Sequence, residues 1–357
     1  MTQFLSAFFI ALTTTFLATP LTIILAKKYK LIDDPKLRPH PAHIHKKVVP
    51  RAGGLPIFLG IVLSMLLFTG ISQINLGIIL SLTILLVVGL LDDALVEFKP
   101  GTRLALQFIP AVIAVFSGIG IDFITSPFGG ILRLDGWRLD FFGFQINVIA
   151  DLFAIVWIVW IQNCVNWSKG VDGQMPTITF VAFLTIGFVS LNFLNLGDSG
   201  QYLPTLLSFI CAGSSLGFLF FNWHPAKIFP GFSGSTILGF MIAVLSIFSS
   251  AKLAVALLVL LIPATDFFYT FFRRILEKKS PLKGDRKHLH HLLLKRGLTS
   301  TQITLLYGAS CAILGVLAAN LESQGKVFTI ILVGVLVLGS LLWLHLLSNR
   351  EEQNEAE

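Results

Sequence analysis

The sequence predicts an all-α polytopic membrane protein with about eleven transmembrane helices and one small extracytoplasmic β-hairpin. Hydrophobic residues make up 55% of the 357 residues and charged residues only 13%, whereas soluble globular domains carry about 25% charged residues. The mean hydropathy is +0.83, and apolar runs recur along almost the whole chain. This composition excludes a cytosolic enzyme, a disordered chain and a nucleic-acid-binding domain, despite the net charge of +7.

The expected spans follow from the length of the apolar runs, because roughly 20 residues are needed to cross the hydrocarbon core of a bilayer. The first run is not a cleaved signal peptide, since no positive charge precedes it and Lys27, Lys28 and Lys30 follow it. This order of charges predicts that the N-terminus lies outside. Eleven ranges qualify as spans: 4–26, 53–70, 75–91, 104–119, 146–163, 175–195, 202–221, 233–249, 252–271, 302–320 and 327–347.

The distribution of positive charge tests this arrangement. The segments expected on the cytoplasmic side contain 22 of the 26 Lys and Arg residues. Such asymmetry is the positive-inside signal, and it explains the basic composition without a nucleic-acid partner. These segments are 27–52, 92–103, 163–174, 222–232, 272–301 and the tail after 348.

The remaining features define one domain. The outer segment 120–145 contains Gly129-Gly130 and Asp135-Gly136 between short β-rich stretches, which predicts the hairpin. The three cysteines are scattered and form no CxxC pair, so neither a disulfide framework nor a zinc site is expected. The prediction is a single transmembrane domain over 1–348 and a cytoplasmic tail over 349–357.

Two adjacent carboxylates close the third span. Asp92 and Asp93 repel each other at a membrane boundary unless a positive group lies between them. Mg²⁺ is such a group, because it binds hard oxygen ligands and bridges to phosphates. Arg103, at the start of the next span, can face the same site. The alternative is a helix end that simply reaches water.

The second polar cluster follows the fifth span. Asn163 and Asn166 lie at i, i+3 and therefore share a helix face. The loop behind them contains Gly170, Asp172 and Gly173, and a carboxylate beside closely approaching backbone suits a nucleotide base or ribose. Ordinary turn formation is an equally good explanation of this loop by itself.

A third cluster, NWHPAKIFPGFSGS at 222–235, leads into the eighth span. A Gly- and Ser-rich loop that opens a helix can bind an anion through free N–H groups and the helix dipole. It is not a nucleophile elbow, because Ser235 stands where GxSxG needs its last glycine.

The long loop before the tenth span carries three histidines within four residues. His288 and His291 share a helix face, and His290 lies between them in sequence. No carboxylate or thiolate completes a zinc set nearby, while the surrounding Lys and Arg residues favour a phosphate-rich ligand. Binding of anionic lipid headgroups by a solvated basic loop is the alternative.

Two further features lie on the same side. Residues 43–54, HIHKKVVPRAGG, form a basic loop that ends in a glycine pair. Asp266 lies inside the ninth span about one turn from its cytoplasmic end, and a buried acid there is expected to face the bundle interior. Arg273 and Arg274 are its expected partners.

These clusters, in this order and on this side, resemble the polyprenyl-phosphate N-acetylhexosamine-1-phosphate transferase family. The resemblance runs over nearly the whole chain and is closest to the bacterial undecaprenyl-phosphate GlcNAc-1-phosphate transferase branch. It differs from the related muramyl-pentapeptide translocase in the histidine loop. The matching motifs are HxxxxPRxGG at 45–54, DD at 92–93, NxxN…GxDG at 163–173, NxxPAKxFxG at 222–231, Asp266…Arg273-Arg274, and DRxHLHHxLLxxG at 285–297.

The resemblance implies transfer of a sugar 1-phosphate from a UDP-amino sugar to undecaprenyl phosphate, with release of UMP, at the cytoplasmic side of the bacterial inner membrane. It further implies Mg²⁺, or Mn²⁺ in its place, on Asp92 and Asp93, one of which would deprotonate the lipid phosphate. The lipid bilayer and the two substrates are the expected partners, and a homodimer remains open. The residues expected at the anionic substrates are His45, Lys46, Arg103, Asn163, Asn166, Lys169, Gly170, Asp172, Asn222, Phe229, His288, His290 and His291, with Phe229 stacking on uracil.

Two residues depart from the family pattern. Lys169 stands where the family usually has an Asp before the GxDG loop, and Phe232 stands in place of the acid of a GDxGS loop, which is commonly a metal ligand. Because the neighbouring Gly, Asn and Pro positions are kept, a coupled exchange is favoured over random decay. The alternatives are an inactive paralogue that binds nucleotide sugar or lipid, and a lipid or solute transporter. A transporter would carry its polar residues at mid-depth on broken helices.

Overall fold

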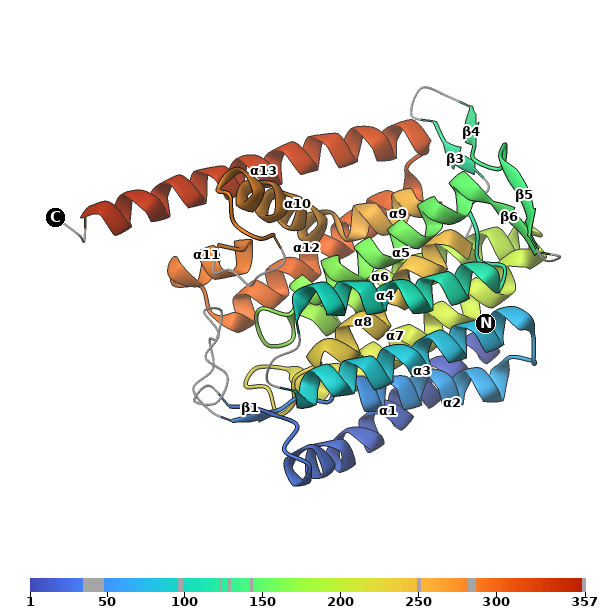
Figure 1. The fold of residues 1–357 in the computed structure, drawn as a ribbon, viewed down its shortest axis with the longest axis horizontal. Helices are drawn as coiled ribbons and strands as arrows, with labels where there is room; N and C mark the ends of the chain where they lie inside the picture. Colours follow the sequence, from blue (N-terminus) through green and yellow to red (C-terminus); the bar gives the residue numbers. More distant parts are fainter. Residues whose placement is uncertain are drawn as a thin grey trace.

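The computed structural model shows a bundle of long helices with roughly aligned axes (Figure 1). It describes residues 1–34, 48–95, 99–121, 123–126, 130–141, 144–248, 252–281 and 287–354. The helices are α1 (Thr2–Lys28), α2 (Gly54–Phe68), α3 (Gln73–Ala94), α4 (Pro100–Phe116), α5 (Val148–Trp167), α6 (Gln174–Asn195), α7 (Tyr202–Asn222), α8 (Gly231–Phe248), α9 (Lys252–Val259), α10 (Leu261–Leu276), α11 (Leu289–Lys295), α12 (Ser300–Asn320) and α13 (Ser323–Asn354), with a 3₁₀ turn at Ser199–Gln201.

The chain is a multi-pass α-helical membrane protein. Among the described residues, eight helices are long and apolar enough to cross a membrane, or nine if the bent pair α9 and α10 forms one span. The shorter apolar helices α2 and α4 have 15 and 17 residues. Ten of the eleven predicted ranges each overlap one helix, and the range 252–271 covers both α9 and α10. The count of eleven spans is not confirmed, because α2 and α4 are shorter than a typical span.

The ninth expected span is not one straight helix. The axes of α9 and α10 differ by 81° at a break next to Leu260, and Pro263 in the first turn of α10 is the local mark of this break. The apolar pattern continues through the break, which is why the sequence predicted one uninterrupted span.

The strands of the described residues form three separate antiparallel pairs. One pair, β1 (Ile32–Asp33) with β2 (Val49–Pro50), joins the chain after α1 to the entry of α2. The other two are β3 (Phe123–Thr125) with β4 (Ile131–Arg133), and β5 (Arg138–Phe141) with β6 (Phe144–Asn147). The single hairpin predicted over 120–145 is not confirmed, because the described residues of this segment form two strand pairs, and Asp135-Gly136 lies between the two pairs.

Helix α8 forms the centre of the bundle. Every residue from Gly231 to Ser246 is buried, and α3 and α5 pack along it. A helix that is apolar on all sides in this way is expected in a core rather than at a surface. The beginning of α8 thereby fixes one point to which the surrounding helices can supply side chains.

The pair of α1 and α7 depends on small residues. Gly213 and Gly217 lie four residues apart on α7, and a Cβ on Gly213 would stand 2.1 Å from the backbone oxygen of Phe8. On Gly217 it would stand 2.5 Å from the oxygen of Leu12. Small residues at this spacing let helix backbones approach closely in membranes.

Gly213→Leu is therefore expected to separate α1 from α7 and to destabilise the protein by about 1–3 kcal/mol, the usual cost of overpacking. Thermal unfolding in detergent measures this effect. Gly334→Leu on α13 is the matched control, because nothing lies within 4 Å of a Cβ at that position. Equal melting temperatures for the two variants would contradict the assigned packing.

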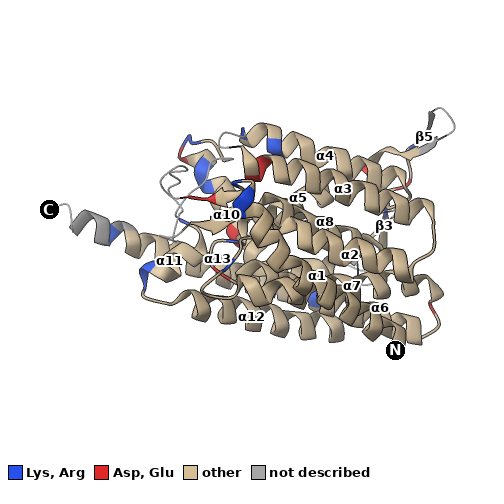
Figure 2. Ribbon diagram, turned by 90° about the horizontal axis from the view of Figure 1, so that it is seen from below, with Lys and Arg blue, Asp and Glu red and all other residues tan. Residues whose placement is uncertain are grey.

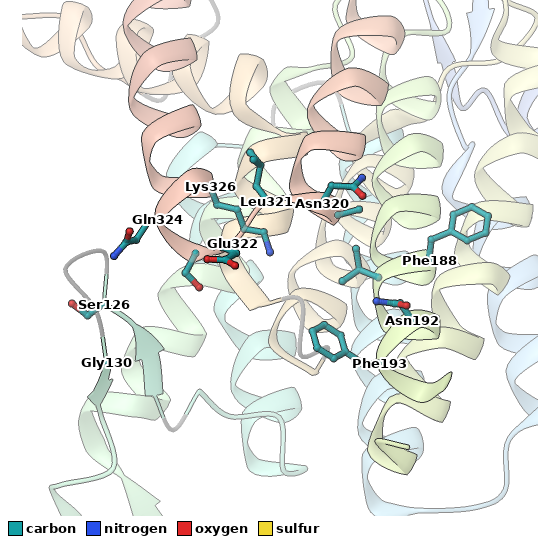
Figure 3. Close-up of a pocket in the computed structure, with 13 residues that line it drawn as sticks. Ser126, Gly130, Phe188, Asn192, Phe193, Asn320, Leu321, Glu322, Gln324 and Lys326 are labelled. Atoms are coloured by element: carbon teal, nitrogen blue, oxygen red, sulfur yellow. The ribbon is translucent and has the colours of Figure 1, made fainter. Parts of the chain in front are cut away.

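The two ends of the bundle differ in character. Lys, Arg, Asp and Glu gather mainly at the end that holds β1, α11 and the start of α8, hereafter the charged end, while the helix shafts carry few charges (Figure 2). The strands β3 to β6 mark the opposite end, hereafter the hairpin end. A cavity of about 820 Å³ there lies between the β3–β4 segment, α6 and the α12–α13 turn, with Asn192, Asn320, Glu322 and Lys326 on its wall (Figure 3).

Candidate functional site at the charged end

Asp93 lies at the centre of the charged end, on the last turn of α3, and its side chain is fully buried. One carboxylate oxygen accepts a hydrogen bond from the Phe232 N–H at 3.0 Å, and the other accepts one from the Ser233 hydroxyl at 3.0 Å. Gly231, with φ +68°, makes this approach possible, because a Cβ there would stand 2.2 Å from Asp93 Oδ2. The beginning of α8 therefore binds an anion, as the loop sequence predicted, but that anion is Asp93.

Three cations surround the two aspartates. Arg103, one-third exposed, makes an ion pair with the buried Asp92, as its position at the start of α4 suggested. Arg51 Nε lies 3.4 Å from Asp93 Oδ1, and the Arg51 side chain also reaches Asp33 at 3.7 Å. Arg51 was missed as a site residue, although its place in PRAGG beside the glycine pair of α2 was the available signal.

Lys169 supplies the third cation. Its side chain is half-buried, and its ammonium donates to the Gly231 carbonyl at 2.9 Å and to Ser235 Oγ at 3.4 Å. The ammonium lies 5.9 Å from the centre of the Phe232 ring, and the Arg103 guanidinium lies 5.8 Å from the same ring. Burial, followed by the like charge of Arg51, lowers the pKa of Lys169 to about 7, against the attraction of Asp93.

The predicted Mg²⁺ site can be tested against these donors. Both oxygens of Asp93 are already bonded inside the protein, and Asp92 is paired with Arg103. Within the described part of the chain, no three His, Cys, Asp or Glu side chains come together as a metal set. Hard cations depend on the number of available carboxylates, so this arrangement does not fit a tightly held ion. Mg²⁺ or Mn²⁺ stays a prediction that these contacts do not favour.

The two asparagines of α5 contact different neighbours. Asn166 Oδ1 accepts a hydrogen bond from Ser235 at 2.8 Å, which joins α5 to the beginning of α8. Asn163 donates to Gln107 on α4 at 2.5 Å and to the Val159 carbonyl on its own helix at 2.8 Å. Their i, i+3 spacing thus places both amides toward the charged end, where they brace α4, α5 and α8.

The residues expected around the nucleoside form a folded loop. Asp172 Oδ2 lies 2.7 Å from His224 Nδ1 and accepts the Ala226 N–H at 3.1 Å. Asn222 accepts the Gly173 N–H at 3.0 Å and donates to the Ile228 carbonyl at 2.8 Å, and its side chain is buried. Through these bonds, Asp172 and Asn222 hold the loop after α5 against the segment between α7 and α8.

Phe229 is held by its backbone. Its N–H donates to the Pro50 carbonyl at 2.8 Å, and its own carbonyl accepts the Gly53 N–H at 3.1 Å. Its half-buried ring belongs to the segment that links Arg51 to α8. The stacking role predicted for this ring remains a prediction.

The histidines form a stacked group at the beginning of α11. His288 Nδ1 lies 2.9 Å from Asp266 Oδ2, and the Leu289 N–H donates to Asp266 Oδ1 at 2.9 Å. The His290 ring is 4.3 Å from His291 and 5.5 Å from His288, measured between ring centres. Burial, together with the neighbouring His291 and His288, lowers the pKa of His290 well below its ordinary value, so His290 is a neutral ring.

Asp266 thus has a different partner from the one expected. Arg273 and Arg274 lie seven and eight residues further on, about two helical turns away. Arg273 pairs with Glu277 at 2.9 Å, and Arg274 donates to the Ser280 carbonyl at 2.7 Å. The expected Asp266–arginine pairing is therefore not among the contacts of the residues that the structure describes.

Gly170 connects the histidine group to the Lys169 loop. A Cβ at this position would stand 1.8 Å from His290 Nε2, so the imidazole lies directly against the glycine backbone. The loop after α5 and the α11 segment, about 120 residues apart in sequence, are brought together at this contact.

Gly170→Ala is expected to push His290 out of place and to lower the affinity for a nucleotide sugar by about tenfold, the effect of one lost polar contact. Calorimetric titration with UDP-GlcNAc measures this loss. Gly101→Ala at the start of α4 is the matched control, because a Cβ there meets nothing within 4 Å. Unchanged affinity in Gly170→Ala would remove His290 from the binding site.

The structure therefore joins nearly all predicted site residues in one contact network. It runs from Asp92 and Arg103 through Phe232 to Lys169, and from Gly170 to His290. His45 and Lys46 lie outside the described residues. Their predicted substrate contacts stay predictions.

The bundle and its charged end define an integral membrane protein with a buried acid–base cluster suited to anionic substrates. Residues 75–250 match glycosyl transferase family 4. The undecaprenyl-phosphate alpha-N-acetylglucosaminyl 1-phosphate transferase of Haemophilus influenzae is 30% identical over 322 residues, which cover 85% of this chain and 84% of that protein. The chain belongs to glycosyl transferase family 4, and it is a phosphoglycosyl transferase.

Other relatives match this chain over most of its length. A probable undecaprenyl-phosphate N-acetylglucosaminyl 1-phosphate transferase of Bacillus subtilis is 29% identical and covers 95% of this chain and 90% of its own. A decaprenyl-phosphate N-acetylglucosaminephosphotransferase of Mycolicibacterium smegmatis is 29% identical, with 82% and 75% covered. The family resemblance drawn from the motifs is confirmed.

Proposed function

We propose that this protein transfers N-acetylglucosamine 1-phosphate from UDP-GlcNAc to undecaprenyl phosphate and releases UMP, as the first membrane step of an envelope glycan. The observation that carries the proposal is the similarity over nearly the full chain to relatives named for this reaction. The cationic cluster of Arg51, Arg103 and Lys169 supports it, because both substrates are anions that repel each other.

The reaction balances without a further reactant. An oxygen of the lipid phosphate attacks the β-phosphorus of the nucleotide sugar, and the bond from that phosphorus to the bridging oxygen breaks. UMP leaves with the bonding electron pair. Such transfers depend mainly on positioning and on neutralising the oxygens, which fixed cations and N–H donors at the charged end can provide.

The two aspartates have separate parts in this proposal. Asp93 is enclosed by Arg51, Phe232 and Ser233, and it orders the beginning of α8. Asp92 is held by Arg103, whose side chain is about one-third exposed. Asp92 therefore is the carboxylate that accepts the proton of the lipid phosphate.

We place the charged end on the cytoplasmic side of the inner membrane. The excess of Lys and Arg in the loops of that end supports this orientation, and nucleotide sugars are made in the cytoplasm. The hairpin end then lies outside, with the N-terminus.

Two alternatives predict different features. A transporter would carry polar groups at the break of a spanning helix, yet Val259, Leu260 and Leu261 at the α9–α10 break are apolar and buried. An inactive nucleotide-sugar-binding paralogue would share the charged end, so only turnover separates it from the transferase.

Purified protein in nanodiscs is expected to release UMP from UDP-GlcNAc only when undecaprenyl phosphate is present. The lipid product is identified by mass spectrometry, and UDP-glucose and UDP-GalNAc test the choice of sugar. Binding of UDP-GlcNAc without UMP release under any metal condition would favour the inactive paralogue.

A further inference from the structure

The carboxylates at the polar centre of this protein are already matched by cations of the chain itself. Arg51 reaches both Asp33 and Asp93, and Arg103 pairs with Asp92. Lys169 is the third cation, and its ammonium lies beside the Phe232 ring of the same cluster. The three carboxylates therefore carry no excess negative charge that would hold a divalent cation.

Phe232 makes this cluster unsuitable for a metal in a second way. Its side chain is buried, with 3% exposed, and it lies beside the carboxylates on the first turn of α8. An aromatic ring offers no oxygen to a hard cation, but its face attracts ammonium and guanidinium groups. Both Lys169 and Arg103 lie within 6 Å of the centre of this ring, at 5.9 and 5.8 Å.

Lys169 is the cation best placed to change partners. Its ammonium is bonded to a neutral carbonyl and a hydroxyl, those of Gly231 and Ser235, whereas Arg51 and Arg103 are paired with carboxylates. An ammonium has three donors, and its half-buried position leaves part of the side chain open. Gly170, the next residue, lies against His290, so Lys169 stands between the histidine group and the aspartates.

We propose that Lys169 is a catalytic residue that binds the diphosphate of the nucleotide sugar and neutralises the charge on departing UMP, replacing a tightly bound divalent metal. This inference rests on the proposed function, because the diphosphate belongs to its donor substrate. As the bridging oxygen takes the electron pair, negative charge grows on the UMP phosphate. A compact ammonium next to that oxygen stabilises the charge without an added ion.

The test compares UDP-GlcNAc binding and UMP release in EDTA and across a Mg²⁺ titration. Lys169→Met keeps an apolar stem over the Phe232 ring and removes the charge, and Lys169→Arg restores a charge. Lys326→Ala, at the hairpin end, is the control lysine. Thermal unfolding of each variant confirms that it is folded.

Wild-type protein is expected to bind UDP-GlcNAc in EDTA with an affinity close to that in Mg²⁺. Lys169→Met should weaken that binding by about 10–100-fold, as expected for a lost charge-assisted contact, and Lys169→Arg should recover part of it. UMP release should follow the same order with a shallow Mg²⁺ dependence in wild type. The double variant Lys169→Asp with Phe232→Asp should gain a steep Mg²⁺ dependence, whereas Phe232→Asp alone should not.

Binding that disappears in EDTA, together with equal affinity of wild type and Lys169→Met, would overturn the assignment. Failure of the proposed function would look different, because no UMP would then be released under any condition. The comparison of UDP-GlcNAc binding with and without EDTA would still decide the role of Lys169.

Discussion

Asp92→Asn is expected to lower UMP release by about two to four orders of magnitude, the range for loss of a positioned general base, while the protein stays folded. The substitution keeps the shape of the side chain and removes the charge that pairs with Arg103. Initial rates of UMP release at saturating UDP-GlcNAc measure the effect. The affinity for UDP-GlcNAc should change much less, because in the proposed reaction Asp92 acts on the lipid phosphate and not on the nucleotide sugar.

Asp93→Asn is expected to lose comparable activity and, in addition, stability. Its carboxylate is fully buried and holds Arg51, the Phe232 N–H and the Ser233 hydroxyl. Breaking a buried ion pair by removing one charge commonly costs about 3–5 kcal/mol. A lower melting temperature for Asp93→Asn than for Asp92→Asn therefore separates the structural aspartate from the reactive one.

Asp135→Asn at the hairpin end is the control for both variants. Asp135 pairs with the exposed Arg133 at 2.8 Å. Because this ion pair lies at the hairpin end, its loss in Asp135→Asn should leave turnover unchanged. Near-normal turnover in both Asp92→Asn and Asp93→Asn would show that the carboxylates do not serve the reaction.

His290→Ala is expected to reduce turnover by about 100-fold, a typical cost of removing one donor from charge that develops in the transition state. The buried neutral ring lies against Gly170, where it can donate a hydrogen bond to the diphosphate. His290→Gln should recover part of the activity because an amide also donates. His345→Ala on α13, whose ring packs near Tyr269 at 6.3 Å between ring centres, is the histidine control.

The same residue predicts a change in stability with pH. Burial holds the pKa of His290 below its ordinary value of 6.5, so the unfolded chain binds a proton that the folded protein excludes. Stability must therefore fall as the pH drops below about 6.5, and His290→Gln should flatten that fall. Melting temperatures between pH 5 and pH 8 measure it. An unchanged pH profile in His290→Gln would mean that this ring is not kept neutral.

Local pattern was enough to find the helices and most of the site. Apolar runs located α1, α3 and α5 to within a few residues, because length and hydropathy depend only on neighbours in sequence. Residue type and spacing predicted a role for Asp92, Asp93 and the histidine group, and the structure places all of them at the charged end. The apolar pattern missed the change of direction at Leu260 between α9 and α10, although Pro263 in the first turn of α10 marks it.

The pairing of charged groups depended on the tertiary structure. Arg51 and Asp93 are 42 residues apart, yet they form an ion pair, and Asp266 binds His288 rather than the arginines on its own helix. Sequence spacing predicts contacts within one helix face, but it does not predict which loop reaches a given helix end. Arg51 was missed for this reason.

The sequence by itself determined a multi-pass helical membrane protein of the transferase family, with most of its charged residues in the loops of one side. Composition and hydropathy predict that the chain is inserted in a membrane, and the order of the motifs indicates the family. Only the tertiary structure decided that Arg51, Arg103 and Lys169 converge on Asp92 and Asp93 around Phe232. The physical reason is that the net charge of a site is summed over side chains from segments that are far apart in sequence. These side chains come together only after α3, α4, α5 and α8 have packed against one another.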